Sequence, residues 1–218
     1  MKITQILIAD DHEVMRRGLR ALLESEPGWH VCGEAATGRE AVALALQLKP
    51  DIIVMDISMP ELNGLDATRQ IKSALPLTEI AILSAVDAEH IVHDVVQAGA
   101  RAYVCKTEAG EQLVAALKAL SERKPYFRSF VTDVLVERYL ATSVATAPAP
   151  VDQPRLTPRE REIVQLLGEG RRSKEAASTL GISVRTVETH RAAIMRKLEL
   201  RTVSDLVRYA IRNGIVEA

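Results

Sequence analysis

The sequence of 218 residues has few aromatic residues, 3% of the total, and only two cysteines. A core must therefore be built mainly from alanine and aliphatic side chains. Cys32 and Cys105 lie far apart and lack the paired spacing of a zinc site or a disulfide framework. We expect both to be small hydrophobic residues buried in strands.

Long hydrophobic runs are also lacking. Unbroken apolar runs such as residues 52–55 fall far short of the ~20 residues that a helix needs to cross a bilayer. The acidic pair Asp10 and Asp11 follows a short apolar stretch, which leaves no room for the hydrophobic core of a signal peptide. We therefore expect a cytoplasmic protein with no membrane partner.

The formal net charge of −1 conceals an uneven distribution of charge. Residues 1–140 carry 15 basic and 20 acidic residues, whereas residues 155–218 carry 13 basic and 8 acidic ones. Between them, residues 141–154 are rich in Ala, Pro and Thr, which is typical of a linker. The sequence predicts an acidic domain over 1–124, a connecting helix and Ala/Pro-rich linker over 125–154, and a basic domain over 155–218.

The acidic half alternates short apolar runs with segments of helical spacing. The apolar runs occupy residues 3–9, 31–32, 51–55, 80–83 and 102–105. This alternation predicts a doubly wound α/β fold, in which helices cover both faces of a five-stranded parallel sheet. The functional crevice of such folds lies at the carboxyl ends of the strands.

Polar residues stand where these strands end. Asp10 and Asp11 follow the first strand, Asp56 ends the third, Ser84 ends the fourth and Lys106 follows the fifth. One such Asp is an ordinary turn residue, but the coincidence of all five is not expected from turns. Three converging carboxylates repel one another unless a cation lies among them, and Mg²⁺ suits oxygen ligands near phosphoryl chemistry.

Phosphoryl transfer to a carboxylate is the chemistry that these groups favour together. Asp56 is the best candidate nucleophile because it lies centrally, and its following loop leaves the Ser58 carbonyl free to face a metal. Lys106 and the Ser84 hydroxyl suit two phosphoryl oxygens.

About residues 3–122 resemble the receiver domain of two-component response regulators. The resemblance is carried by Ile8–His12, Val54–Pro60, Asn63–Gly64, Ser84–Ala85, Gly99–Ala100 and Tyr103–Lys106. It implies that Asp56 accepts a phosphoryl group from a sensor histidine kinase. It also implies that Asp10, Asp11, Asp56 and the Ser58 backbone carbonyl hold Mg²⁺, and that Ser84 and Tyr103 change position on phosphorylation.

Some residues have an ordinary structural interpretation. A lone tyrosine in a strand is usually a half-buried core residue, but the place of Tyr103, three residues before Lys106, favours the switch of the receiver family. The four histidines of the acidic half show no metal-like grouping and are interpreted as surface or packing residues; they are His12, His30, His90 and His93. Trp29 is interpreted as a packing residue.

The basic half has the pattern of a helix-turn-helix. Thr157 and Glu160 form a capping box around Pro158. Ser173 is expected to cap a short second helix and Ser183 a third over 184–198. A fourth helix is expected over about 202–213.

The outward positions of the predicted third helix suit DNA. The candidates for reading bases are Arg185, Thr186, Glu188, Thr189, Arg191 and Ala192, and those for phosphates include Lys174 and Lys197. The ordinary alternative is a small helical bundle with a solvated basic face.

The basic half also resembles a known DNA-binding domain, the LuxR-type helix-turn-helix. The segments that carry the resemblance are Leu156–Glu162, Lys174–Ala177, Gly181–Ile182, Thr186–His190 and Arg196–Leu198. Joined to a receiver, this domain is similar to the NarL/FixJ response regulators. The resemblance implies that helix 184–198 enters the major groove and that the last helix pairs two copies on repeated half-sites.

The hypothesis is a transcriptional regulator, not an enzyme, controlled by phosphorylation and active as a homodimer on DNA. Phosphorylation is expected to repack helices over about 88–97 and 108–121, which either releases the recognition helix or drives dimerisation. Three alternatives remain: DNA binding independent of phosphorylation, a LuxR regulator that senses a small molecule, and a Mg²⁺-dependent phosphatase. The phosphatases typically have a second acid where Ser58 stands.

Overall fold

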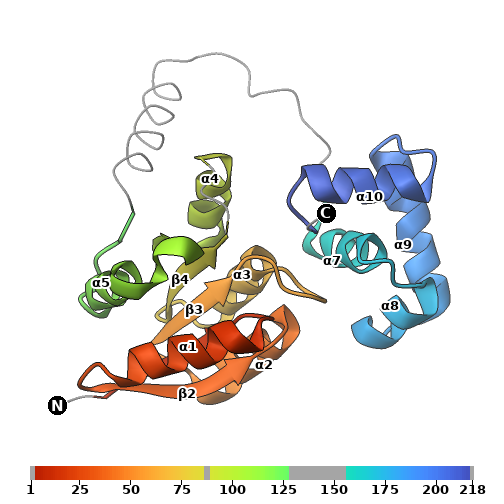
Figure 1. Ribbon diagram of the computed structural model, residues 1–218. Coiled ribbons are helices and arrows are strands. Elements are labelled where there is room, and N and C mark those ends of the chain that lie inside the picture. The colour runs from red at the N-terminus through yellow and green to blue at the C-terminus, as the bar shows by residue number, and fades with distance from the viewer. Residues whose placement is uncertain (1–2, 86–88, 128–155, 217–218) are drawn as a thin grey trace. The chain divides into compact units, whose positions relative to one another are not determined.

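The computed structural model describes residues 3–85, 89–127 and 156–216, and the chain forms two compact units (Figure 1). One unit is built on a parallel sheet and the other is helical. Residues 128–155, which include most of the predicted connecting helix and linker, lie outside the described residues.

The sheet of the first unit confirms the predicted doubly wound α/β fold. Among the described residues its strands follow the order β2-β1-β3-β4-β5, and all neighbours pair in parallel. The strands are β1 (Thr4–Ala9), β2 (Trp29–Ala35), β3 (Ile52–Asp56), β4 (Glu79–Ser84) and β5 (Ala102–Cys105). β2 is longer than its apolar run predicts because it lies at the edge of the sheet, where half-buried polar residues are tolerated.

Helices cover both faces of the sheet, with α1 and α5 on one face and α2, α3 and α4 on the other (Figure 1). Their bounds are α1 (Glu13–Glu24), α2 (Gly38–Leu48), α3 (Gly64–Ala74), α4 (Glu89–Ala98) and α5 (Ala109–Ser121), with a 3₁₀ turn η1 (Lys106–Glu108) before α5. Alternate strand residues such as Ile6 and Val54 pack against Leu23 of α1 and Leu117 of α5. The core is aliphatic, as the scarcity of aromatic residues predicts.

Most residues interpreted as packing or surface residues lie as expected. Cys105 is buried in β5 and Cys32 is half-buried in β2. Trp29 packs against the core beside α1, and His12 and His30 are exposed. His93 is half-buried on α4, and the side chain of His90 lies outside the described residues.

The helical unit contains α7 (Pro158–Gly168), α8 (Ser173–Leu180), α9 (Val184–Lys197) and α10 (Val203–Arg212). Thr157, Ser183 and Thr202 cap α7, α9 and α10 through their side chains. The predicted cap of α8 is wrong by one residue. Arg172 is the N-cap because its backbone is extended and Ser173 is already helical, and the Arg172 N–H donates to the Glu175 carboxylate at 2.7 Å.

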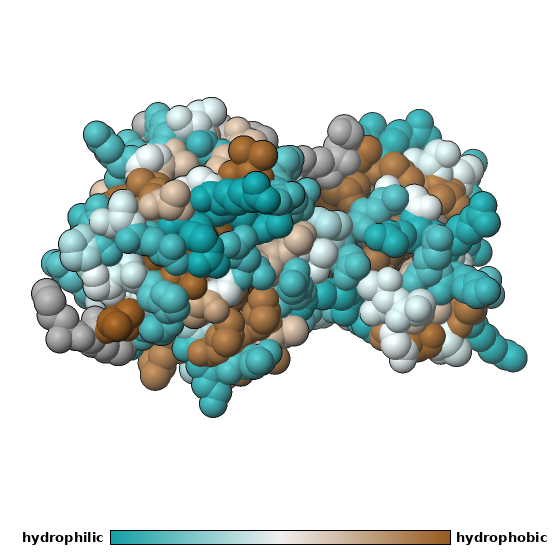
Figure 2. Space-filling view, turned by 60° about the horizontal axis from the view of Figure 1, so that its bottom comes forward, coloured by the Kyte–Doolittle hydropathy of each residue, from teal (hydrophilic) through white to brown (hydrophobic). Residues whose placement is uncertain are grey.

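The face drawn in Figure 2 is covered mainly by hydrophilic residues, and hydrophobic residues come to the surface in small groups. This is the surface expected when each unit buries an apolar core of its own. None of the helices in the described parts of the chain has the length and apolar character that crossing a bilayer requires.

Candidate functional site

The sheet register brings the predicted polar residues to one edge. Ala9 pairs with Met55, Asp56 with Leu83, and Ser84 with Cys105, so the strands end at nearly the same level. In a parallel sheet these ends face the same side. The residues that follow β1, end β3 and β4, and follow β5 therefore meet there, as the sequence predicts.

Lys106 joins the two buried carboxylates at this edge. Its Nζ lies 2.7 Å from Asp56 Oδ2 and 2.8 Å from Asp10 Oδ2. Asp10 is fully buried and Asp56 is 2% exposed. Burial alone lowers the pKa of Lys106, but its hydrogen bonds with the two carboxylates outweigh this effect and raise it. Lys106 is therefore a fixed positive charge between two buried acids.

The carboxylates form a cluster with the geometry of a cation site. Ligand atoms of Asp10, Asp11, His12 and Asp56 all lie within 4.8 Å of one another. Asp11 is the accessible carboxylate of this cluster, with a side chain 33% exposed, and its Oδ1 lies 2.7 Å from His12 Nδ1. Hard carboxylate oxygens in this number fit Mg²⁺.

Asp56 has an unusual affinity for protons. Its pKa is raised to about 6, mainly through desolvation by burial, against the opposing effects of Lys106 and of a backbone hydrogen bond from Ser58. The negative charge of Asp10 contributes to this increase in the pKa. Above pH 6 the site therefore holds a poorly solvated negative charge, which a divalent cation would compensate.

Asp56→Asn is expected to stabilise the metal-free α/β unit at pH 8, by about 2 kcal/mol. The folded pKa of Asp56 lies above its unfolded value, so the proton it binds stabilises the fold at low pH. This contribution is lost as the pH rises through about 6. Asparagine removes the cost of the buried charge, although Lys106 loses one partner. The advantage of the variant is expected to shrink towards pH 4.

Urea unfolding with a chelator present measures this difference at the two pH values. The single tryptophan, Trp29, packs in the α/β unit, so its fluorescence reports on that unit. The control Asp94→Asn removes an exposed carboxylate on α4 and is expected to change stability by less than about 0.5 kcal/mol. An Asp56→Asn effect that does not depend on pH would contradict the raised pKa.

The two predicted switch residues are both buried. Ser84 ends β4 and is 4% exposed, and Tyr103 in β5 is 1% exposed. Tyr103 pairs with Ile82 in the register, two residues before Ser84. The tyrosine is thus more deeply buried here than the ordinary half-buried alternative implies. Its role in switching stays a prediction.

The candidate DNA-reading residues share one helix. α9 buries Val187 and Ile194 against the helical core. Its exposed positions hold most of the predicted base contacts, namely Arg185, Thr186, Glu188, Thr189 and Ala192. Arg191 is half-buried, and Lys174 on α8 is exposed.

Contacts within the helical unit engage some of these side chains. Thr189 Oγ1 donates to the Arg185 carbonyl at 2.8 Å, and Thr186 Oγ1 lies 2.8 Å from Ser183 Oγ. Lys197 Nζ donates to Glu160 Oε2 at 2.7 Å, which ties the end of α9 to the start of α7. The predicted phosphate contact of Lys197 therefore competes with an ion pair inside the domain.

The structure adds two residues that the sequence did not single out for the site. The prediction that His12 lacks a metal-like grouping is wrong, because the turn after β1 brings its ring within 4.8 Å of the ligand atoms of the acidic cluster; its exposure still agrees with its interpretation as a surface residue. Arg16 of α1 donates from Nη1 to the Asp10 carbonyl at 2.8 Å. Its position four residues after the N-cap of α1 was a possible signal, because the first helical turn faces the end of β1.

Comparison with protein families identifies both units. The family "Response regulator receiver domain" matches residues 6–118. The family "Bacterial regulatory proteins, luxR family" matches residues 154–210. Together the two matches span most of the chain.

Individual proteins resemble this chain over nearly all of their own length. The transcriptional regulatory protein LiaR of Bacillus subtilis (strain 168) is 36% identical over 97% of this chain and 99% of its own length. A LuxR-family two-component response regulator from Aurantimonas sp. SI85-9A1 has 31% identity and a TM-score of 0.59 over 64% of this chain and 99% of that one. RcsB of Salmonella enterica serovar Typhimurium, solved on a promoter with the phosphomimetic BeF₃⁻, has 26% identity and a TM-score of 0.59, covering 95% and 98% of the two chains.

Proposed function

The chain belongs to the two-component response regulators that join a receiver domain to a LuxR-type helix-turn-helix domain, the NarL/FixJ family, and from this premise we propose that phosphorylation of Asp56 controls its binding to DNA. The observation that carries the proposal is the ion pairing of Lys106 with both Asp56 and Asp10 at the carboxyl edge of the sheet. The same proposal makes the protein a cytoplasmic transcriptional regulator, with a sensor histidine kinase as its phosphodonor.

Asp56 is suited to be the acceptor. Its carboxylate oxygen attacks the phosphorus of a phosphohistidine on the kinase, and the new P–O bond forms as the P–N bond breaks. The departing ring nitrogen keeps the electron pair and takes a proton from water, which leaves an acyl phosphate on Asp56 and a neutral imidazole on the kinase. The raised pKa of about 6 makes the carboxylate a better nucleophile while it stays mostly ionised at neutral pH. Lys106 lies beside the attacking group and can pair with a phosphoryl oxygen.

The acidic cluster is suited to hold Mg²⁺ during this step. The proposed ligands are the carboxylates of Asp10, Asp11 and Asp56 and the Ser58 carbonyl, and Asp10 and Asp56 are buried. Bound there, Mg²⁺ supplies charge neutralisation for the phosphoryl oxygens. The protein is an acceptor that is phosphorylated once per signal and not a turnover catalyst, which agrees with the regulatory family.

The added charge must reach the rest of the domain through buried residues. Ser84 and Tyr103 lie on the adjacent strands β4 and β5. In the chain, helix α4 follows β4 and helix α5 follows β5. We propose that the hydroxyl of Ser84 binds a phosphoryl oxygen and that Tyr103 repacks in response. The result is either release of the recognition helix or dimerisation.

α9 is proposed as the helix that reads the major groove. Its exposed side chains combine donors, acceptors and methyl groups suited to base edges, and Lys174 suits a phosphate. α10 presents Val203, Val207 and Ile211 at intervals of four residues on one face, and Val203 is 52% exposed. This apolar face supports pairing of two copies through α10 on repeated half-sites.

Genomic DNA capture tests control by phosphorylation. Wild type and Asp56→Asn are incubated with fragmented DNA, with and without acetyl phosphate and Mg²⁺, and the bound DNA is sequenced. The phosphodonor is expected to raise capture of specific sites about tenfold for wild type and to leave the variant unchanged. Equal enrichment for both proteins would instead support DNA binding that is independent of phosphorylation.

A further inference from the structure

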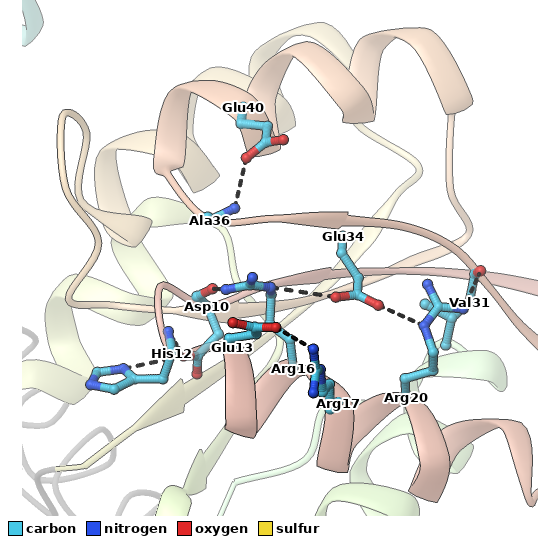
Figure 3. A network of polar contacts seen from close by, with 10 residues as sticks. All are labelled: Asp10, His12, Glu13, Arg16, Arg17, Arg20, Val31, Glu34, Ala36 and Glu40. Carbon is cyan, nitrogen blue, oxygen red and sulfur yellow. Dashed lines mark hydrogen bonds and ion pairs between the residues drawn. The ribbon is translucent and has the colours of Figure 1, made fainter.

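An ion-pair network lies directly behind the acid pair. Arg16 of α1 reaches between the end of β1 and the end of β2, where Nη1 donates to the Asp10 carbonyl at 2.8 Å and Nε lies 3.4 Å from Glu34 Oε2 (Figure 3). The other oxygen of Glu34 accepts from Arg20 Nε at 2.6 Å. Arg20 also pairs with Glu24. The network thus links successive turns of α1 to both strand ends.

Arg16 is held firmly in this position. Its side chain is 15% exposed and that of Glu34 is 28% exposed, so water competes little for their contact. The hydrogen bond from Arg20 orients the Glu34 carboxylate, which faces Arg16 Nε as an ion-pair partner at 3.4 Å; this buried nitrogen forms no hydrogen bond with the described residues. A planar guanidinium can satisfy two acceptors at a set angle, which an ammonium cannot do.

Besides its contact with Arg16, Asp10 has three contacts, and each is with a strand residue or a residue of the site. Its N–H donates to the Ala35 carbonyl at 3.1 Å, its Oδ1 accepts from the His12 N–H at 2.8 Å, and its Oδ2 pairs with Lys106. Its carbonyl begins the turn that carries Asp11, and the donor to that carbonyl is Arg16. Arg16 therefore sets the direction of the peptide that links the two acids.

We propose that Arg16, oriented by Glu34, is a positioning residue that fixes the Asp10–Asp11 peptide and thereby sets the affinity of the acidic cluster for a divalent cation. The inference rests on the proposed function in taking the cluster as the cation site. When a residue that orients a metal ligand is removed, the affinity for the metal typically falls by about ten- to a hundredfold.

The sign of the effect separates positioning from simple electrostatics. Arg16 is a positive charge near the cluster, so if its charge dominated, Arg16→Met would tighten the binding of a cation. Positioning predicts the opposite. Arg16→Lys keeps the charge but cannot span both the Asp10 carbonyl and Glu34, so positioning predicts weaker binding here too, whereas a charge effect predicts no change.

The test is a titration of the full chain with Mg²⁺ alone, followed by the amide signals of the Asp10–Asp11 turn in NMR spectra. Arg16→Met is expected to raise the dissociation constant about tenfold. Glu34→Gln is expected to raise the dissociation constant less. The double variant Arg16→Met/Glu34→Gln is expected to raise it no more than Arg16→Met alone, because both residues act through one chain of contacts. The control is Arg17→Met. Arg17 is the next residue of α1 and pairs with Glu13 at the surface, so this variant is expected to leave the dissociation constant unchanged.

A second readout distinguishes this inference from the proposed function. With acetyl phosphate, Arg16→Met is expected to reach the wild-type phosphorylation rate at saturating Mg²⁺ but to need about tenfold more Mg²⁺ for half of it. Tighter or unchanged Mg²⁺ binding in Arg16→Met overturns the inference, as does a wild type that binds no Mg²⁺. A wild type that binds Mg²⁺ with the expected Arg16 dependence but takes up no phosphoryl group overturns the proposed function alone. If Arg16→Met fails to fold, Glu34→Gln and Arg16→Lys decide the question.

Discussion

Asp56→Asn is expected to lower phosphoryl uptake from acetyl phosphate more than about a thousandfold, to background. The amide nitrogen of asparagine has its lone pair delocalised and cannot attack phosphorus, while the side chain keeps the size of aspartate. The neighbouring buried acid, Asp10, is not suited to replace it. Asp10 is fully buried, and its two carboxylate oxygens are occupied by His12 and Lys106.

Intact mass spectrometry directly after incubation measures this loss as the fraction of chains that carry one phosphoryl group. Asp51→Asn is the matched control because Asp51 directly precedes β3, whose last residue is Asp56. Its carboxylate accepts a hydrogen bond from the Gln5 N–H at the opposite end of the sheet. Uptake by the control is expected to equal that of wild type. Undiminished uptake by Asp56→Asn would show that the acceptor is a different residue.

Gly64→Ala is expected to destabilise the α/β unit by about 3 kcal/mol or more. Gly64 is the first residue of α3, and its N–H donates to the Ile57 carbonyl at 2.8 Å. A Cβ at this position would lie 1.9 Å from the Asp56 carbonyl oxygen and 2.8 Å from its carbonyl carbon. Both are backbone atoms, so either α3 or the end of β3 must move.

The same displacement is expected to affect the chemistry of the site. A shift of about 1 Å at a nucleophile can cost on the order of a hundredfold in rate, so phosphoryl uptake per folded chain should fall by about that factor. Urea unfolding followed by Trp29 fluorescence gives the stability, and intact mass gives the uptake.

Gly18→Ala provides the control for this substitution. Gly18 lies in the middle of α1, and a Cβ there meets nothing within 4 Å. Because glycine weakens a helix interior, alanine is expected to stabilise the unit by about 0.5–1 kcal/mol. Wild-type stability in Gly64→Ala would mean that α3 does not approach the Asp56 carbonyl as closely as the structure shows.

The sequence was sufficient to predict the fold of both units for a definite reason. Apolar runs such as residues 52–55 and 80–83 leave few alternatives to buried parallel strands, and cap residues such as Thr157 and Thr202 mark helix starts by local hydrogen bonding. The prediction fell short where the signal is weak: β2 at the sheet edge lacks a continuous apolar run, and the N-cap of α8 is Arg172, one residue before the predicted Ser173.

Sequence by itself also determined which residues meet at the candidate site. Parallel strands must end on the same side, so the residues that follow or end them converge whatever the details of packing; this applies to Asp10, Asp56 and Lys106. Their chemistry follows from the residue types, which is why carboxylates beside a lysine already indicated phosphoryl transfer.

Only the tertiary structure decided the contacts between residues whose spacing in the chain is not set by the helix period or the strand period. Arg16 meets Glu34 across 18 positions, and Lys197 meets Glu160 across 37. Gly64 must lack a side chain because α3 begins against the Asp56 carbonyl, a distance that no local pattern encodes. Local interactions and strand direction can be derived from a one-dimensional pattern, whereas these contacts depend on how helices settle on the sheet after it has formed.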